Sequence, residues 1–292
     1  MNVLTRRAAL ASMAALMPTL VSARTFTKTT PSIDQQFSAL EAAHGGRLGV
    51  AVLDTQTGKS FGHRQHERFA MCSTFKLILA AAILRRVEQG TEHLDRMVPY
   101  SQADLLEYAP VTRAHVSDGA MNVSALCDAA VTLSDNTAAN LLLASIGGPT
   151  GWTGYLRTLG DTVSRLDRNE PSLNTAIPGD PRDTTTPSVM LADMHKVLLG
   201  NALPEPARDQ MKRWMMDCKT ADTKIRAGLP AGWHAGNKTG SGDNGSTNDI
   251  AIIVRPGRAP ILVAAYYTGS TAPAAARNGV LASVGRIVAS AV

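Results

Sequence analysis

A serine and a lysine stand three residues apart at the head of a long apolar stretch. Ser73 and Lys76 precede the run Leu77 to Leu84, and the stretch stops at Gly90. Alanine within the run favours a helix and glycine is a natural terminator, so we predict a helix over residues 73–89. At this spacing the two side chains share one face of its first turn.

This placement can activate a serine. Ser73 would lie at the positive end of the helix dipole, which favours developing negative charge. Burial of Lys76 would lower the pKa of its ammonium group and allow it to act as a base. The helix dipole and this base together would make Ser73 a nucleophile. The alternative is structural, with a serine that caps the helix and a lysine that extends along the surface. The rest of the chain has to decide between them.

Composition indicates a globular protein. The 292 residues are 44% hydrophobic and 18% charged, which fits one large domain or two closely packed ones. Aromatic residues make up only 4%, so aliphatic side chains must fill the core.

The N-terminus resembles an export signal. Arg6-Arg7 precede the apolar residues 8–16, and Val21-Ser22-Ala23 resembles a cleavage site, so we predict a signal peptide over residues 1–23. Thr5-Arg6-Arg7 fits either the twin-arginine or the Sec route. Cleavage removes two arginines and no acidic residue, which lowers the formal net charge from +5 to +3. We expect an exported, periplasmic monomer that binds neither nucleic acid nor, after cleavage, a membrane.

Cysteine and histidine spacing argues against a metal site. Cys72, Cys127 and Cys218 number three, so at least one is free unless it pairs between chains. None forms a Cys-x-x-Cys pair, and the histidines lack ligand spacing. We therefore expect no metal and no cofactor.

Strand patterns lie at the two ends of the chain and helical patterns in the middle. We predict strands over residues 47–54, 60–63, 233–239, 249–255 and 261–268, and terminal helices over 31–44 and 274–292. Between them, helices are predicted over 101–106, 122–133, 137–145, 150–159, 187–199 and 204–217. The expected fold is α+β, with a five-stranded antiparallel sheet covered on one face by the terminal helices. Residues 24–72 and 220–292 would form this α/β lobe and residues 73–219 an inserted all-helical lobe, with the site at their interface.

Three further stretches are each ordinary when taken alone. Ser134-Asp135-Asn136 could be a helix cap, and Lys238-Thr239-Gly240-Ser241-Gly242 a turn after a strand. Glu170-Pro171-Ser172-Leu173-Asn174 lies in an aperiodic stretch and could be a surface loop.

Together and in this order, the motifs resemble those of class A serine β-lactamases. Ser-x-x-Lys, Ser-Asp-Asn, Glu-x-x-x-Asn and Lys-Thr-Gly follow one another, and the resemblance covers essentially the whole mature chain. It implies a β-lactamase/DD-peptidase-like fold. It also implies hydrolysis of the β-lactam amide bond of penicillins and cephalosporins through a serine acyl-enzyme, and so antibiotic resistance.

The resemblance also assigns catalytic roles. Ser73 would attack the lactam carbonyl, and the backbone N–H groups of Ser73 and Ser241 would form the oxyanion hole. Lys76 would orient Ser73, and the acylation base would be Lys76 or Glu170. Ser134 would pass a proton to the lactam nitrogen.

Binding roles follow in the same way. Lys238 would polarise Ser134 and attract the substrate carboxylate, and Asn136 would bind the substrate's side-chain amide. Thr239, Gly240 and Ser241 would also contact the substrate. Glu170 and Asn174 would hold and activate a water molecule. Arg168 and Asp183 would clamp the neck of the loop that carries Glu170. Tyr108 would form an aromatic gate beside the nucleophile. The alternative for Tyr108 is a half-exposed packing residue.

The chain departs from the family pattern at several positions. Some relatives join the position of Cys72 by a disulfide to a position that is Gly242 here, and others join that of Cys127 to a position that is Ala80 here. Cys127 should therefore be a free, buried thiol. Thr247 stands where many relatives have a carboxylate-binding arginine, so Lys224 or Arg277 should supply that cation. A solvated surface lysine is the alternative for Lys224.

Two other functions share part of the motif set. A penicillin-binding DD-peptidase or transpeptidase normally lacks the Glu-x-x-x-Asn loop that discharges the acyl-enzyme. A β-lactam sensor domain stays acylated and needs a membrane connection, whereas this chain shows only a cleavable signal.

Overall fold

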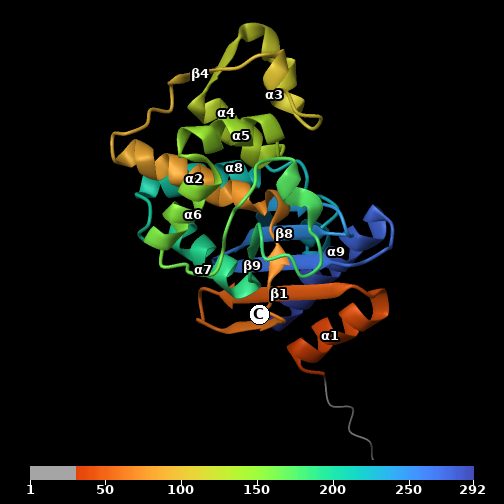
Figure 1. Cartoon of the computed structure of the whole chain (residues 1–292). Helices are drawn as coiled ribbons and strands as arrows, with labels where there is room; N and C mark the ends of the chain where they lie inside the picture. Colours follow the sequence, from red (N-terminus) through yellow and green to blue (C-terminus); the bar gives the residue numbers. More distant parts are fainter. Residues whose placement is uncertain (1–30) are drawn as a thin grey trace, which may run out of the picture. The chain divides into compact units, whose positions relative to one another are not determined.

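A five-stranded antiparallel sheet forms the base of the computed structural model, which describes residues 31–292 (Figure 1). The strands run in the order β2-β1-β9-β8-β7, so both ends of the chain contribute to one sheet. Their bounds are β1 Arg47–Asp54, β2 Ser60–His63, β7 His234–Ser241, β8 Thr247–Arg255 and β9 Arg258–Thr268. The predicted fold class is confirmed. The export signal predicted for residues 1–23 lies outside the described residues.

The terminal helices cover one face of the sheet, as predicted. Leu48, Val50 and Val52 alternate along β1 onto this face. They pack with Phe37 of α1 (Ile33–His44) and Val284 of α9 (Ala274–Ala291). The alternation arises because successive side chains of a strand point to opposite faces.

The other face carries the larger core. Ala51 of β1 and Ile250 of β8 join a cluster that includes α2 (Phe75–Glu88), which is buried along Phe75 to Leu84. The other long helices are α4 Val123–Thr132, α5 Asn136–Ser145, α6 Gly148–Thr158, α7 Pro187–Leu198 and α8 Glu205–Met216. Because its residues Phe75 to Leu84 are all buried, the first turn of α2 is held in the interior, and Figure 1 shows this helix among the other helices above the sheet.

Several short elements were not predicted. Two small strand pairs and a five-residue helix have too few residues to show periodicity. They are β3 Phe69–Ala70 with β6 Thr184–Thr185, β4 Met97–Pro99 with β5 Ala120–Asn122, and α3 Pro110–Ala114. The helix predicted over residues 101–106 is only a 3-10 turn. Such turns are Cys72–Thr74, Gln102–Asp104, Val116–Asp118, Ser172–Thr175 and Ile225–Gly228.

Residues 32–292 form one compact unit. The lobe boundaries proposed from the sequence stay a prediction. Within the described residues, no helix combines the length and apolar character that a bilayer crossing requires.

Candidate active site

The predicted site residues meet at one cleft of about 470 Å³. Lys76, Glu170 and Lys238 are buried and reach its wall through hydrogen bonds to Ser73 and Ser134. The other predicted residues line the cleft directly: Ser73, Tyr108, Ser134, Asn136, Asn174, Lys224, Thr239, Gly240 and Ser241. All twelve are therefore brought together from positions that span most of the chain.

Ser73 lies in the 3-10 turn that leads into α2. Its predecessor Cys72 has a φ of 46°, an unusual left-handed conformation that turns the chain sharply before the helix. The Ser73 hydroxyl caps no helix amide. Instead, Oγ donates a hydrogen bond to Glu170 Oε1 at 3.0 Å, so the capping alternative is wrong.

Lys76 is fully buried and bridges three parts of the site. Its Nζ lies 2.9 Å from Glu170 Oε1, and it donates to Asn136 Oδ1 at 2.6 Å and to the Ser134 carbonyl at 2.8 Å. Burial lowers the pKa of this ammonium group, and the negative charge of Glu170 opposes that shift. The surface-lysine alternative is therefore wrong, and Lys76 lies within reach of two potential proton carriers.

The Ser134-Asp135-Asn136 motif is held by its middle residue. Asp135 caps α5 by accepting from the Ala138 N–H, and it also accepts from the backbone of Val111 and Thr112. Ser134 adopts a left-handed φ of 60°. Its side chain and that of Asn136 both contact Lys76 Nζ.

Lys238 approaches Ser134 from β7. Its Nζ donates to Ser134 Oγ at 3.0 Å, and its side chain is fully buried. Burial and then the charge of Lys76 lower the pKa of Lys238 to about 7. Two residues further on, a Cβ at Gly240 would lie 2.9 Å from the Met71 carbonyl and 3.2 Å from the Ser73 nitrogen. Glycine therefore lets β7 pass directly beside the nucleophile.

The loop that carries Glu170 is fixed to α5 by a residue that the sequence reading missed. Asn140 accepts from the Glu170 N–H at 3.0 Å and donates to the Glu170 carbonyl at 2.9 Å. Asn140 lies one helical turn after Asn136, and this i, i+4 spacing was the available signal. Asn174 Nδ2 donates to Glu170 Oε2, and its own Oδ1 is buried without a partner in the described part of the chain.

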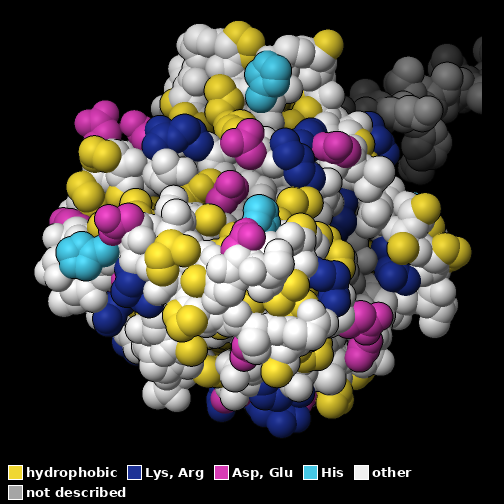
Figure 2. All heavy atoms as spheres, turned by 90° about the horizontal axis from the view of Figure 1, so that it is seen from above, with side chains coloured by type: hydrophobic (Ala, Val, Ile, Leu, Met, Phe, Trp, Pro, Cys, Tyr) yellow, Lys and Arg dark blue, Asp and Glu magenta, His cyan; other side chains and the backbone are white. Residues whose placement is uncertain are grey.

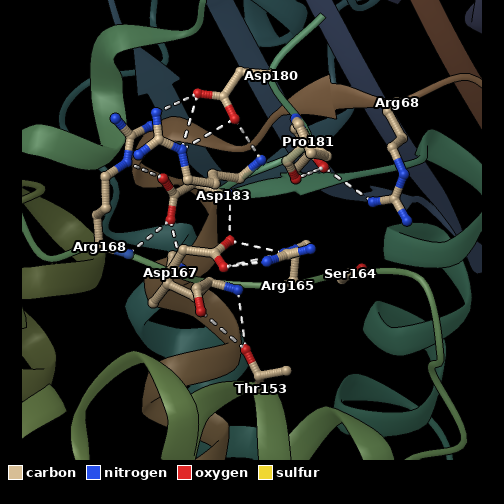
Figure 3. A network of polar contacts seen from close by, with 12 residues as sticks. Arg68, Thr153, Ser164, Arg165, Asp167, Arg168, Asp180, Pro181 and Asp183 are labelled. Carbon is tan, nitrogen blue, oxygen red and sulfur yellow. Dashed lines mark hydrogen bonds and ion pairs between the residues drawn. The ribbon is translucent and has the colours of Figure 1, made fainter.

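The neck of this loop is closed by a charged network (Figure 3). Arg168 Nε lies 2.6 Å from Asp183 Oδ2, and Asp183 Oδ1 accepts from the Asp167 and Arg168 N–H groups. Arg165 adds an ion pair to Asp167. Asp183 is fully buried, so these bonds fix the two ends of the loop against each other.

Two cations line the cleft beside Thr247. Lys224 is only 4% exposed, and its Nζ faces the carbonyls of Gly240 and Asn248 at 3.5 and 3.4 Å. Burial lowers its pKa. Arg277 Nε donates to Thr247 Oγ1 at 3.2 Å. The alternative of a solvated Lys224 is wrong, and both candidates for the carboxylate-binding cation reach the same pocket.

The thiols are free and buried at Cys72, Cys127 and Cys218. A Cβ at Gly242 would lie 2.8 Å from Cys72 Sγ, so these two positions are adjacent even though glycine precludes a disulfide here. Across residues 31–292, no three His, Cys, Asp or Glu side chains group in a way that could hold a metal ion.

Known proteins share this sequence and architecture. A model of the beta-lactamase enzyme family matches residues 32–292. Beta-lactamase AST-1 of Nocardia asteroides is 49% identical over 90% of this chain and 84% of its own length, and Beta-lactamase Toho-1 of Escherichia coli is 46% identical over 97% of each.

Solved structures agree. An ancestral (GNCA) class A beta-lactamase matches with a TM-score of 0.88 and 56% identity, over 89% of this chain and all of that one. The putative class A beta-lactamase PenP from Rhodopseudomonas palustris matches with a TM-score of 0.87 and 50% identity, over 89% of this chain and 99% of that one. With the motif residues gathered at one cleft and the family model matched from residue 32 to the C-terminus, this chain belongs to the class A serine β-lactamases.

Proposed function

We propose that this chain hydrolyses the β-lactam amide bond of penicillins and cephalosporins through a serine acyl-enzyme and so confers antibiotic resistance. The observation that carries the proposal is the contact of Ser73 Oγ and Lys76 Nζ with the same oxygen, Glu170 Oε1, at 3.0 and 2.9 Å. A serine hydroxyl that donates a hydrogen bond to a buried carboxylate, with an ammonium group next to that carboxylate, is activated as a nucleophile.

In acylation, Glu170 is the favoured acceptor of the Ser73 proton, because the Ser73 hydroxyl already donates its hydrogen bond to this carboxylate. Lys76 lies between Glu170 and Ser134, with Nζ 3.4 Å from Ser134 Oγ, and can return a proton toward the leaving nitrogen. Lys238, 3.0 Å from the same hydroxyl, stabilises negative charge on it. The N–H groups of Ser73 and Ser241 supply the oxyanion hole, where loss of one donor typically costs about 10²–10³ in rate.

Substrate binding uses the lining of the cleft. The substrate carboxylate would meet Lys224, Arg277 and Lys238, helped by the Thr239 hydroxyl and by the space that Gly240 leaves. Asn136 would bind the side-chain amide, and Tyr108, which is 48% exposed, would close the opening as a gate.

Deacylation requires a water molecule on the ester. Glu170 Oε2 and the buried, unpartnered Asn174 Oδ1 provide two acceptors for one. The same pair distinguishes this site from that of a DD-peptidase or a sensor domain, in which the acyl-enzyme persists.

We further propose that the protein acts as an exported, periplasmic monomer with a small-molecule β-lactam as its partner. Lys and Arg are interspersed with Asp and Glu on the surface that Figure 2 displays, which argues against binding nucleic acid.

The test is turnover of nitrocefin by the purified mature protein. Many molecules opened per active site are expected, and a single equivalent followed by arrest would indicate a peptidase or a sensor. Ser73→Ala should lose covalent labelling by a penicillin in mass spectrometry. Labelling of that variant at any other serine would contradict the proposal.

A further inference from the structure

A second cavity, of about 460 Å³, lies at the end of α2 that is remote from Ser73. Its wall combines one face of α2 with residues of α6 and of the turn after α7. Among the residues that line it are Ala82, Arg85, Arg86, Tyr155, Leu159 and Ala202. It shares no lining residue with the catalytic cleft.

The cavity is cationic. Arg85 and Arg86 line it, and its lining contains no aspartate or glutamate. Arg85 is ion-paired with Glu88, whereas Arg86 has no ion pair among the described residues and interacts with the charge of Glu92 only without direct pairing. Arg86 has only a long bond of 3.4 Å from one terminal nitrogen to the Thr91 carbonyl, and its Nε is buried with no partner among the described residues.

A phenol supplies a second unused donor. Tyr155 lines the same cavity, and its hydroxyl oxygen is buried without a hydrogen-bond partner in residues 31–292. Burial raises the pKa of this hydroxyl, so it keeps its proton at neutral pH and has that proton available to donate. An unsatisfied buried donor costs free energy that a ligand with acceptor oxygens would recover.

The remaining wall is mixed: Gln89, Thr158 and Asn201 are its polar side chains, and the others are small or apolar. Ala82, Leu159 and Ala202 offer hydrocarbon surface beside the two donors. A volume of this size accommodates a small organic molecule. The occupant that satisfies all of these features carries a negatively charged oxygen group at one end and an apolar body at the other.

We propose that this cavity is a binding site for a small organic anion, with its carboxylate or phosphate held by Arg86 and Tyr155 and its apolar body against Ala82 and Leu159. It is separate from the β-lactam site. A guanidinium group is suited to it because its planar donors match the oxygens of carboxylates and phosphates.

Calorimetric titration with phenyl phosphate tests the proposal, with phenol as the uncharged control ligand. Wild type should bind phenyl phosphate saturably and phenol far more weakly. Arg86→Met should weaken the binding of phenyl phosphate by at least about tenfold, as loss of a charged hydrogen bond implies. Tyr155→Phe, which removes one oxygen and leaves the ring in place, should weaken it severalfold.

The matched control is Arg277→Met, which removes a cation from the catalytic cleft instead. It should leave phenyl phosphate affinity unchanged. The proposal is overturned if phenol binds as well as phenyl phosphate, if neither Arg86→Met nor Tyr155→Phe weakens binding, or if only Arg277→Met does.

Discussion

Glu170 Oε1 is shared by Ser73 and Lys76, so loss of this carboxylate affects the two half-reactions unequally. In Glu170→Ala, the buried Lys76, with its lowered pKa, remains beside Ser73 as an alternative base for acylation. Deacylation has no such substitute, because the carboxylate that would take a proton from the water is lost and the Asn174 amide that remains is not a base. We expect a trapped penicilloyl adduct in intact-mass spectra and steady-state hydrolysis reduced by about 10²–10⁴, the usual share of a general base.

The matched control for this prediction is Asn174→Ala, which removes the neighbouring acceptor and keeps the carboxylate. It should slow hydrolysis less and accumulate less adduct. Turnover by Glu170→Ala at the wild-type rate would show that the loop does not discharge the acyl-enzyme.

Lys224 and Arg277 offer a second prediction at the level of single residues. A cation that binds the substrate carboxylate contributes about 1–2 kcal/mol, in the range of a charge-assisted hydrogen bond, or roughly 5- to 30-fold in kcat/KM. Lys224→Ala should show this loss mainly as a higher KM, because the carboxylate keeps its charge throughout the reaction. Inhibitors of the clavulanate type, which carry the same carboxylate, should weaken in parallel.

Arg277→Ala, measured beside it, assigns the role. A change below about twofold for Lys224→Ala with a large change for Arg277→Ala would transfer carboxylate binding to Arg277. If the two variants lose comparable affinity, the carboxylate is shared between the two cations.

At the level of elements, α5 positions the loop that carries Glu170. Asn140 forms two hydrogen bonds with the Glu170 backbone, one to its N–H and one to its carbonyl, and no other side chain in residues 31–292 bonds to both groups. Asn140→Ala leaves a part-buried N–H and carbonyl unpaired, which costs about 1–3 kcal/mol of stability. We expect a lower melting temperature and a deacylation rate reduced more than acylation.

Asn140→Asp is the informative companion variant. It retains an acceptor for the Glu170 N–H and loses the donor to the carbonyl, so its deacylation rate should fall between those of wild type and Asn140→Ala. Burst and steady-state phases of penicillin hydrolysis separate the two steps. Equal deacylation rates in all three proteins would mean that the neck formed by Arg168 and Asp183 alone fixes the loop.

The elements that sequence predicted best are the long, periodic ones. The hairpin over residues 47–54 and 60–63 and the helix at 187–198 match within a residue, because alternation or helical spacing persists over them. The two-residue pairing of Phe69–Ala70 with Thr184–Thr185 carries no such pattern. It forms through tertiary contacts.

The same distinction holds within the site. The motif residues could be placed in one site because their order resembles a known family, but the partners that orient them are non-local. Lys224, for example, is buried beside Asp249, whose negative charge opposes the lowering of the lysine pKa. Asp249 is itself held by Asn237 on β7. No spacing rule connects these three positions, so only the fold reveals how the buried charge of Lys224 is balanced.

At the scale of the whole molecule, two buried carboxyl groups from different parts of the chain interact. Asp161 lies in the segment before the Glu170 loop, and Asp193 lies on α7. Asp161 Oδ1 accepts from the Val163 and Ser164 N–H groups, whereas its Oδ2 and both oxygens of Asp193 lack hydrogen-bond donors within the described structure. Asp193 is 1% exposed. Burial and then the charge of Asp161 raise the pKa of Asp193 to about 8, so Asp193 holds a proton at neutral pH.

This proton makes stability depend on pH. The unfolded chain releases it near the ordinary value of 3.8 and the folded chain near 8, so between these values the folded state binds more protons. The contribution of Asp193 to the free energy of unfolding therefore falls as pH rises across this window and is constant outside it.

Asp193→Asn mimics the protonated carboxyl group. Urea unfolding should show the variant becoming progressively more stable than wild type from about pH 4 to about pH 8. A pH-independent difference between Asp193→Asn and wild type would mean that Asp193 is already ionised in the folded protein.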